Sequence, residues 1–320
     1  MQLSELYEVG KSKLSREEYG RLLGFVETGF IEHNDRRELD RYTFRQRCID
    51  AKEASTACRV LNVELSTPVT MSAMTMPIPA ISENGLLEVA RGLQAAGSLM
   101  WTGTPLPQNL GEILSTGVPL VANVKPYRDR GKLDEEIEAI VEAGVTWLGL
   151  EIDSGQGTKV QDKEMAFDCS PWAQKEIEAI KSRAPMPLVC KGVLSREDAL
   201  KCIDAGADLL VVSHHGGHTL DYMPHPLQIM DEIVQAVNGK VPLMIDGGFR
   251  RGSDVLKGLA SGADLVGLGR PILYGLAANG EDGVREVIQG ITRELARLMT
   301  MVGASEPAKI SPDILIRSRS

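Results

Sequence analysis

The chain has 320 residues, of which 43% are hydrophobic and 25% are charged, and its formal net charge at pH 7 is −9. This is an ordinary globular composition, and the negative charge argues against a nucleic-acid partner, because non-specific binding to nucleic acid needs clustered positive charge. No apolar run approaches the about 18 residues that cross a bilayer, and the N-terminal sequence has no apolar signal core, so we expect a cytoplasmic protein without a membrane span.

Residues 1–65 are charged and differ in pattern from the rest of the chain. The stretches SREEYGRLLGFVETG (15–29) and EHNDRRELDRYTFRQR (32–47) are expected to be helical. We interpret residues 1–65 as an N-terminal helical extension packed on the domain that follows, and not as a separate domain.

From residue 66 onward one pattern repeats: a short apolar run, a polar or glycine-rich loop, and an amphipathic stretch that often ends in Ala-Gly. Runs that are apolar on both faces are typical of strands covered on both sides by helices. The sequence therefore predicts a (β/α)8 TIM barrel over residues 66–320, since eight such runs occur, at 67–74, 97–103, 118–124, 146–152, 186–192, 208–214, 241–247 and 264–270.

An open, doubly wound α/β sheet is the alternative fold. That fold places a nucleotide-binding glycine motif after its first strand. Here the first run is followed by TMPIPAISENG (75–85), which contains no such motif. In the barrel, chemistry takes place where the strands end and the following loops begin. Candidate site residues at these positions are Ser72, Thr102, Gly103, Asn123, Lys125, Glu151, Asp153, Lys191, Ser213, His215, Asp246 and Arg270.

The last two runs are followed by glycine and arginine, in IDGGFRRGSD (245–254) and GLGRP (267–271). Barrels often bind phosphate at the loops after strands seven and eight, where glycines let backbone N–H groups approach the anion and arginine grips it. Tight turns alone would also explain the glycines. Lys191 ends the fifth run, where burying its charge requires a partner. The anionic edge of a reduced flavin is one such partner, and a side chain that reaches solvent is the alternative.

Two long stretches carry a family resemblance: KGVLSREDALKCIDAGADLLVVSHHGGHTLD (191–221) and IDGGFRRGSDVLKGLASGADLVGLGRPILYGLA (245–277). They resemble the FMN-dependent 2-hydroxy acid oxidases and dehydrogenases, the family of glycolate oxidase and lactate oxidase. The likeness is close over 190–303 and weaker over 40–155. It implies the same barrel, bound FMN, a small-molecule substrate and a homo-oligomer, and it leaves the electron acceptor open.

The resemblance also implies roles for individual residues at the cofactor. Lys191 would contact flavin N1 and O2, and Ser213 would contact the ring system. Ser72 and Ala73 would lie beside the flavin, and Asn123 stands where the family usually has glutamine. The ribityl chain and phosphate would be held by Asp246, Gly248, Arg250, Gly269 and Arg270.

Three of the five histidines lie in SHHGGH (213–218), where the family usually has Ser-Asn-His-Gly-Gly-Arg. His215 therefore aligns with the catalytic base, which takes a proton from the substrate while hydride equivalents pass to flavin N5. Asp153 aligns with the carboxylate that supports this base. A structural histidine and a metal site formed by His214, His218 and Asp221 are the alternatives. Two glycines inside the cluster break helical spacing, so we predict no metal.

The residues that usually clamp a substrate carboxylate are replaced. His218 stands for an arginine, Lys125 and Phe25 for tyrosines, Glu151 for a threonine, and the loop 154–168 contains no arginine. Arginine and histidine are not interchangeable at a bidentate site. We expect Lys125, Glu151 and His218 to contact the substrate. Because Glu151 would repel a carboxylate, the substrate is expected to differ from glycolate and lactate, and a cationic or polyhydroxylated molecule is one possibility.

Three functions follow. The first is an FMN-dependent oxidoreductase that acts on a hydroxy-acid-like substrate or another alcohol or amine. The second is an FMN-dependent isomerase related to type 2 isopentenyl diphosphate isomerase, whose early strand the stretch SAMT (72–75) resembles. The third is a flavin- or metal-binding protein without turnover. The retained His-Gly-Gly favours the first.

Overall fold

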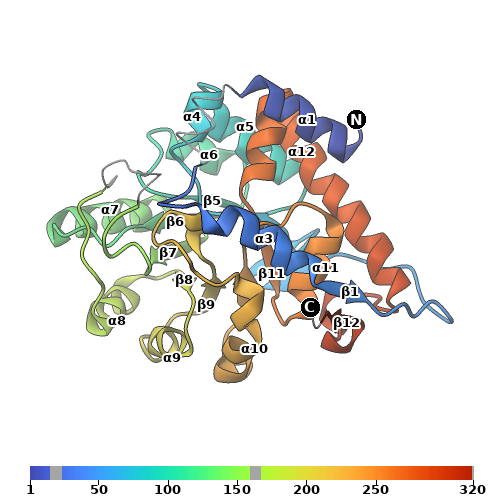
Figure 1. The fold of residues 1–320 in the computed structure, drawn as a ribbon. Helices are drawn as coiled ribbons and strands as arrows, with labels where there is room; N and C mark the ends of the chain where they lie inside the picture. The colour runs from blue at the N-terminus through green and yellow to red at the C-terminus, as the bar shows by residue number, and fades with distance from the viewer. Residues whose placement is uncertain (15–23, 159–166, 319–320) are drawn as a thin grey trace.

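The computed structural model describes residues 1–14, 24–158 and 167–318. Eight parallel strands form one sheet in the order β4-β11-β10-β9-β8-β7-β6-β5 (Figure 1). The backbone N–H of Met71 on β4 donates to the carbonyl of Leu99 just before β5, at 3.2 Å, and so brings the two ends of the sheet together. The predicted (β/α)8 barrel is confirmed, and all eight predicted runs contain a strand.

The barrel strands are short and almost completely buried, as expected for strands covered on both faces. Their side chains alternate between the barrel interior and the surrounding helices. The strands are β4 (Val69–Met71), β5 (Met100–Thr102), β6 (Leu120–Val124), β7 (Trp147–Glu151), β8 (Leu188–Val193), β9 (Leu209–Val212), β10 (Leu243–Ile245) and β11 (Leu265–Leu268).

The helices form the outer ring of the barrel (Figure 1). Side chains cap several of them: Asp129 accepts from the N–H groups of Gly131 and Lys132, and Ser195 accepts from that of Asp198. The ring consists of α4 (Ile78–Ile81), α5 (Gly85–Ala95), α6 (Leu110–Ser115), α7 (Arg130–Ala143), α8 (Gln174–Arg183), α9 (Arg196–Asp204), α10 (Pro226–Val237), α11 (Gly252–Ala260) and α12 (Arg270–Met301).

The barrel interior is filled by large side chains. Trp101 and Trp147 are fully buried there with aliphatic residues from most of the strands. A hairpin of β2 (Cys58–Val60) and β3 (Val63–Leu65) adds Val60, Val63 and Leu65 to the same cluster. The indole N–H of Trp147 also donates to Asn62 in the turn of this hairpin, at 2.8 Å. The barrel interior around these residues is therefore a packed core.

The N-terminal segment contains strands as well as helices. Helix α1 (Leu3–Lys13) lies along α12, and α3 (Phe30–Asp40) crosses the barrel beside the ends of several strands (Figure 1). Strand β1 (Tyr42–Phe44) pairs antiparallel with β12 (Leu315–Arg317) near the C-terminus. The predicted helix that starts at residue 15 begins outside the described residues. Short 3₁₀ turns complete the structure: η1 (His215–Gly217), η2 (Pro307–Lys309) and η3 (Pro312–Ile314).

No helix within the described ranges is long and apolar enough to span a bilayer. The division into an extension over 1–65 and a barrel over 66–320 stays a prediction. The contacts that join the two segments are nevertheless extensive. The hydroxyl of Tyr7 on α1 donates to the carbonyl of Arg250 at 2.9 Å, and the buried ammonium of Lys257 on α11 donates to that of Leu39 on α3 at 2.8 Å.

Helix α1 approaches α12 so closely that Gly10 has no room for a side chain. A Cβ at Gly10 would lie 2.1 Å from the carbonyl oxygen of Tyr274. We expect Gly10→Ala to lower the free energy of unfolding in urea by about 1–3 kcal/mol, because a backbone must shift to make room. Gly111→Ala is the matched control, since nothing lies within 4 Å of its Cβ position in α6. Equal effects of the two substitutions would contradict the close packing.

Candidate active site

A cavity of about 360 Å³ opens at the carboxyl ends of the barrel strands. This size is within the range of small-molecule sites. Most of the predicted site residues line it: Ser72, Ala73, Lys125, Glu151, Lys191, His215, His218, Asp246, Gly248, Arg250, Gly269 and Arg270. Asp153 and Ser213 lie directly behind His215, and Asn123 is fully buried beside Gly149. Gly103, directly after β5, lines the cavity as well, so the chain brings residues from all eight strand ends to one cavity.

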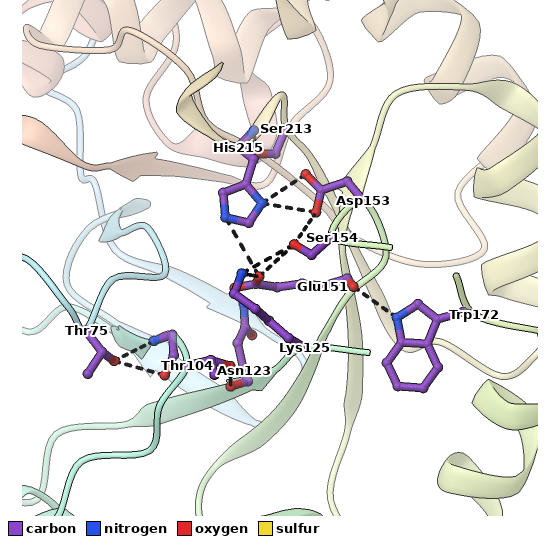
Figure 2. Close-up of polar contacts among 11 residues, drawn as sticks. Thr75, Thr104, Asn123, Lys125, Glu151, Asp153, Ser154, Trp172, Ser213 and His215 are labelled. Atoms are coloured by element: carbon purple, nitrogen blue, oxygen red, sulfur yellow. Dashed lines mark hydrogen bonds and ion pairs between the residues drawn. The ribbon is translucent and has the colours of Figure 1, made fainter. Parts of the chain in front are cut away.

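His215 is oriented by Asp153. Its Nδ1 lies 3.0 Å from both carboxylate oxygens of Asp153 (Figure 2). This contact places the imidazole hydrogen on Nδ1 and leaves the lone pair on Nε2. Nε2 lies 3.8 Å from Oε2 of Glu151, and the His215 side chain lines the cavity. The arrangement is that of a general base whose partner stabilises the positive charge gained on protonation.

The backbone at His215 is held in an uncommon conformation. Its φ is 55°, in the left-handed region, and φ is also positive at Gly216 and Gly217. A residue other than glycine adopts this conformation only where its surroundings impose it, and such positions cluster at functional sites. Here the N–H of His215 donates to Oγ of Ser213 at 3.0 Å. Ser213 therefore helps to fix the turn that aims the imidazole.

Lys125 and Glu151 form an ion pair beside His215. Lys125 Nζ contacts Glu151 Oε2 at very short range, and the two side chains are only 4% and 2% exposed. Oγ of Ser154 donates to the same Oε2 at 3.0 Å and accepts from Lys125 Nζ at 3.3 Å. Figure 2 shows these three side chains gathered below the His215 ring. Two of the residues that replace the usual substrate-binding side chains, Lys125 and Glu151, are thus paired with each other.

The charges around His215 stabilise one another. Burial opposes ionisation of Glu151, but Lys125, His215 and Lys191 outweigh it and hold its pKa far below the ordinary value. Burial likewise opposes the charge of Asp153, and His215 then lowers the pKa of that carboxyl. The pKa of Lys191 is raised despite burial, because three carboxylates face it. Both acids and Lys191 are therefore charged at neutral pH.

The cavity contains buried polar groups that fit the polar edge of a flavin. Oγ of Ser72 and Oδ1 of Asp246 are buried and have no hydrogen-bond partner. Lys191 lines the same cavity with a buried side chain that three carboxylates face. Buried polar groups normally have partners. The two unpartnered groups, Ser72 and Asp246, indicate a polar ligand in this cavity, and a bound FMN would supply a donor or acceptor for each.

The two glycine-rich loops border the same cavity. Gly247 and Gly248 have φ of 109° and 73°, which favour glycine and turn backbone toward the opening. A Cβ at Gly267 would lie 2.5 Å from Oγ of Ser72, so a side chain at this position would force Ser72 to move. Arg250 and Arg270 line the cavity beside these loops. Two guanidinium groups and exposed backbone fit the phosphate of FMN, and we assign the phosphate to this end.

The three polar side chains of the alternative metal site do not converge. His214 Nε2 contacts Asp35 at 2.8 Å, and Nε2 of His218 contacts the carbonyl of Gly24 at 2.8 Å. Asp221 accepts from the N–H groups of Thr28 and Phe30, at 2.9 and 3.1 Å. Each side chain instead ties the loop after β9 to the N-terminal segment. Within the described ranges, no group of histidine, cysteine and acidic side chains could hold a metal ion.

His218 lines the cavity but carries no charge at neutral pH. Burial, together with the positive charges near it, lowers its pKa to about 3. Its Nε2 is also occupied by the carbonyl of Gly24. A neutral and already bonded imidazole supplies no positive charge to a substrate anion, so His218 does not take over the charge of the arginine that is usual in the family.

The His214–Asp35 pair gives the fold a pH dependence. Burial opposes both charges, but mutual attraction raises the pKa of His214 above its ordinary 6.5 and lowers that of Asp35 below 3.8. The contribution of His214 to the free energy of unfolding is complete below pH 6.5 and is lost as pH rises through the raised pKa of His214. The contribution of Asp35 is complete above pH 3.8 and is lost as pH falls through the lowered pKa of Asp35. The pair therefore stabilises the fold most between these limits.

We expect Asp35→Asn to lower Tm more at pH 6 than at pH 9, measured with saturating FMN. His225, which faces the same pair, stays neutral at both pH values because burial lowers its pKa to about 4. Asp40→Asn is the control, since Asp40 lies on the same helix and pairs with Arg36 at the surface. A Tm loss of equal size at both pH values for Asp35→Asn would contradict the charged pair.

Sequence reasoning missed several residues of the site. Ser154 bonds to Glu151, and the indole N–H of Trp172 donates to the Glu151 carbonyl at 2.9 Å (Figure 2). Asp35 lines the cavity from α3. Ser154 and Trp172 come from the loop after β7, where only the missing arginine had been considered. Nothing in the sequence marks Asp35, because its partner lies 179 positions away.

The chain is similar in sequence to proteins of one known family. The sequence model of the FMN-dependent dehydrogenase family matches residues 10–173 and 155–317. The peroxisomal (S)-2-hydroxyacid oxidase GLO4 of Arabidopsis thaliana is 31% identical over 337 residues, which cover 94% of this chain and 92% of the relative. GLO3 of the same plant is 46% identical over 157 residues, which span 49% of this chain and 43% of that relative.

Solved structures are similar over nearly the whole chain. A lactate oxidase from Pediococcus acidilactici has a TM-score of 0.91 and 26% identity, covering 100% of this chain and 95% of its own. Mandelate oxidase with (S)-2-phenylpropionate has a TM-score of 0.89 and 28% identity, covering 98% and 97%. The family match covers most of the described barrel and its cavity. The chain therefore belongs to the FMN-dependent dehydrogenase family and is an oxidoreductase that uses FMN.

Proposed function

We propose that this protein oxidises the alcohol carbon of a hydroxy-acid-type substrate, with His215 as the base and Asp153 as its positioning partner. The observation that carries the proposal is the His215–Asp153 contact, which occupies Nδ1 and leaves Nε2 as the ring nitrogen available to a substrate in the cavity that His215 lines. The relatives named as hydroxyacid, lactate and mandelate oxidases support this substrate type.

Oxidation of an alcohol to a carbonyl removes one proton and one hydride equivalent. His215 Nε2 accepts the proton, and the resulting imidazolium is stabilised by Asp153 on one side and Glu151 on the other. FMN, when bound, supplies the acceptor for the hydride equivalent. Lys191, Ser72 and Asp246 are the residues we assign to its polar edge, and Arg250 and Arg270 those we assign to its phosphate.

The test is anaerobic mixing of the FMN-loaded protein with a panel of hydroxy acids, hydroxy amides, sugar alcohols and amino acids. We expect the visible flavin absorbance to bleach with the hydroxy compounds. No bleaching by any member would overturn the proposed oxidation. Double-bond isomerisation of isopentenyl diphosphate, with bleaching only by an external reductant, would instead support the isomerase.

The cytoplasmic location and the homo-oligomeric state stay predictions, and the sequence names no electron acceptor. Oxygen consumption during turnover distinguishes an oxidase from a dehydrogenase that uses another acceptor. The mass of the FMN-loaded protein in solution, measured by light scattering, gives the number of subunits. A mass near the 34.8 kDa of one chain would contradict the homo-oligomer.

A further inference from the structure

We propose that the preferred substrate carries an amide, in place of a free carboxylate, next to the carbon that is oxidised. The inference rests on the proposed function, because it names the substrate class of the same site. Its basis is the Lys125–Glu151 ion pair beside His215. In this pair Glu151 neutralises the Lys125 ammonium that a substrate carboxylate would need. The pair offers an amide both a hydrogen-bond donor and an acceptor.

A carboxylate at this position would lie next to Glu151. The substrate hydroxyl must come within about 2.6–3.2 Å of His215 Nε2 to lose its proton there. Oε2 of Glu151 lies 3.8 Å from the same Nε2. A carboxylate on the neighbouring carbon is thus brought beside a carboxylate that is ionised at neutral pH. Because the site is buried, the repulsion between the two is poorly screened.

Within the described ranges, each cationic side chain that lines the cavity already faces a carboxylate or is assigned to the phosphate. Four cationic side chains line its described part: Lys125, Lys191, Arg250 and Arg270. Lys125 is neutralised by Glu151, and Lys191 faces three carboxylates. The two arginines border the glycine loops that we assign to phosphate. His218, which stands where the family has an arginine, is neutral. A substrate carboxylate would therefore find no unassigned cation among the described residues that line the cavity.

The same pair is complementary to an amide. Lys125 Nζ has three donors and uses two of them, toward Glu151 and Ser154, so one remains for a carbonyl oxygen. Oε1 of Glu151 accepts no hydrogen bond from any residue in the described ranges, although Glu151 lines the cavity. An amide can accept from Lys125 through its C=O and donate to Glu151 through its N–H. An ester or a dialkyl amide satisfies only the first of these groups.

The test compares binding of two product analogues to the oxidised, FMN-loaded protein by titration calorimetry. We expect pyruvamide to bind at least about tenfold more tightly than pyruvate, a difference of about 1.4 kcal/mol. N,N-dimethylpyruvamide, which lacks the N–H donor, should bind more weakly than pyruvamide. Tighter binding of pyruvate than of pyruvamide, or no binding of either, overturns the inference.

The variant Glu151→Gln removes the negative charge and keeps the shape of the side chain. We expect it to reduce or reverse the preference for pyruvamide, by strengthening the binding of pyruvate. Glu136→Gln is the matched control: Glu136 is half-buried on α7, accepts from the N–H of Leu106 and lies outside the cavity lining. It should keep the wild-type preference. If Glu151→Gln does not fold, the comparison of ligands on the wild-type protein still decides.

This result is separable from the proposed function. If pyruvamide binds tightly but neither lactamide nor lactate bleaches the flavin, the amide inference holds and the oxidation fails. If lactate bleaches the flavin and pyruvate binds more tightly than pyruvamide, the oxidation holds and the amide inference fails.

Discussion

Replacing His215 by asparagine is expected to slow reduction of the flavin by substrate about 10²- to 10⁴-fold, the usual contribution of a general base. The visible spectrum of bound FMN should be unchanged, because His215 lies on the substrate side of the cavity and its main partner is Asp153. Anaerobic stopped-flow absorbance measures the rate, and the spectrum of the purified variant measures retention of FMN.

His33→Asn is the control for this substitution. His33 lies on α3 at an exposed position, outside the cavity, so its variant should reduce the flavin at the wild-type rate. Flavin reduction by His215→Asn at the wild-type rate would show that His215 is not the base of the reaction. Loss of FMN from that variant would instead indicate a structural role, the alternative that the histidine cluster left open.

Replacing Arg250 by alanine is expected to weaken FMN binding about 10- to 100-fold, because a hydrogen bond to a charged group contributes about 1.5–3 kcal/mol. Arg250 lines the cavity after β10, beside the left-handed pair Gly247 and Gly248. Fluorescence titration of the FMN-free protein with FMN measures the dissociation constant. Rates at saturating FMN should change much less, since Arg250 is far from the reacting hydroxyl in this account.

The neighbouring residue gives a matched control. Arg251 is also an arginine of the same loop, but its guanidinium pairs with Glu294 on α12 and does not line the cavity. Arg251→Ala should therefore bind FMN with the wild-type constant. Equal weakening of FMN binding in both variants would show that the overall positive charge of the loop holds the phosphate. Unchanged FMN binding in Arg250→Ala would show that the phosphate lies away from Arg250.

The barrel could be predicted because its strands are buried on both faces. Each of the eight apolar runs contains a strand. Lys125, Glu151 and Asp246 lie at strand ends, and Lys191 lies two residues before the end of β8. The carboxyl ends of parallel strands in a barrel meet at one rim. The positions of these polar residues in the sequence were therefore enough to indicate a shared site. The short pairs β1–β12 and β2–β3 were not predicted, because three-residue strands leave little periodicity, and β1 pairs with a partner at the far end of the chain.

The partners of the site residues could not be predicted in the same way. Lys125 and Glu151 were recognised as replacements, but their ion pair depends on side-chain conformations across two strands. The His214–Asp35 contact joins residues far apart in sequence, and the burial that keeps His218 neutral is a property of the folded chain. The sequence alone does not indicate which residues far apart in the chain come into contact.

The most direct test of the account measures the isotope effect on anaerobic reduction of the bound flavin. A substrate that bleaches the flavin is prepared with hydrogen or deuterium on the alcohol carbon, and the two forms are compared in single-turnover stopped-flow experiments. We expect the deuterated form to reduce the flavin more slowly, because that C–H bond breaks as the flavin is reduced. Equal rates at every substrate concentration would contradict the proposed oxidation, because they would separate cleavage of the C–H bond from the proton transfer to His215.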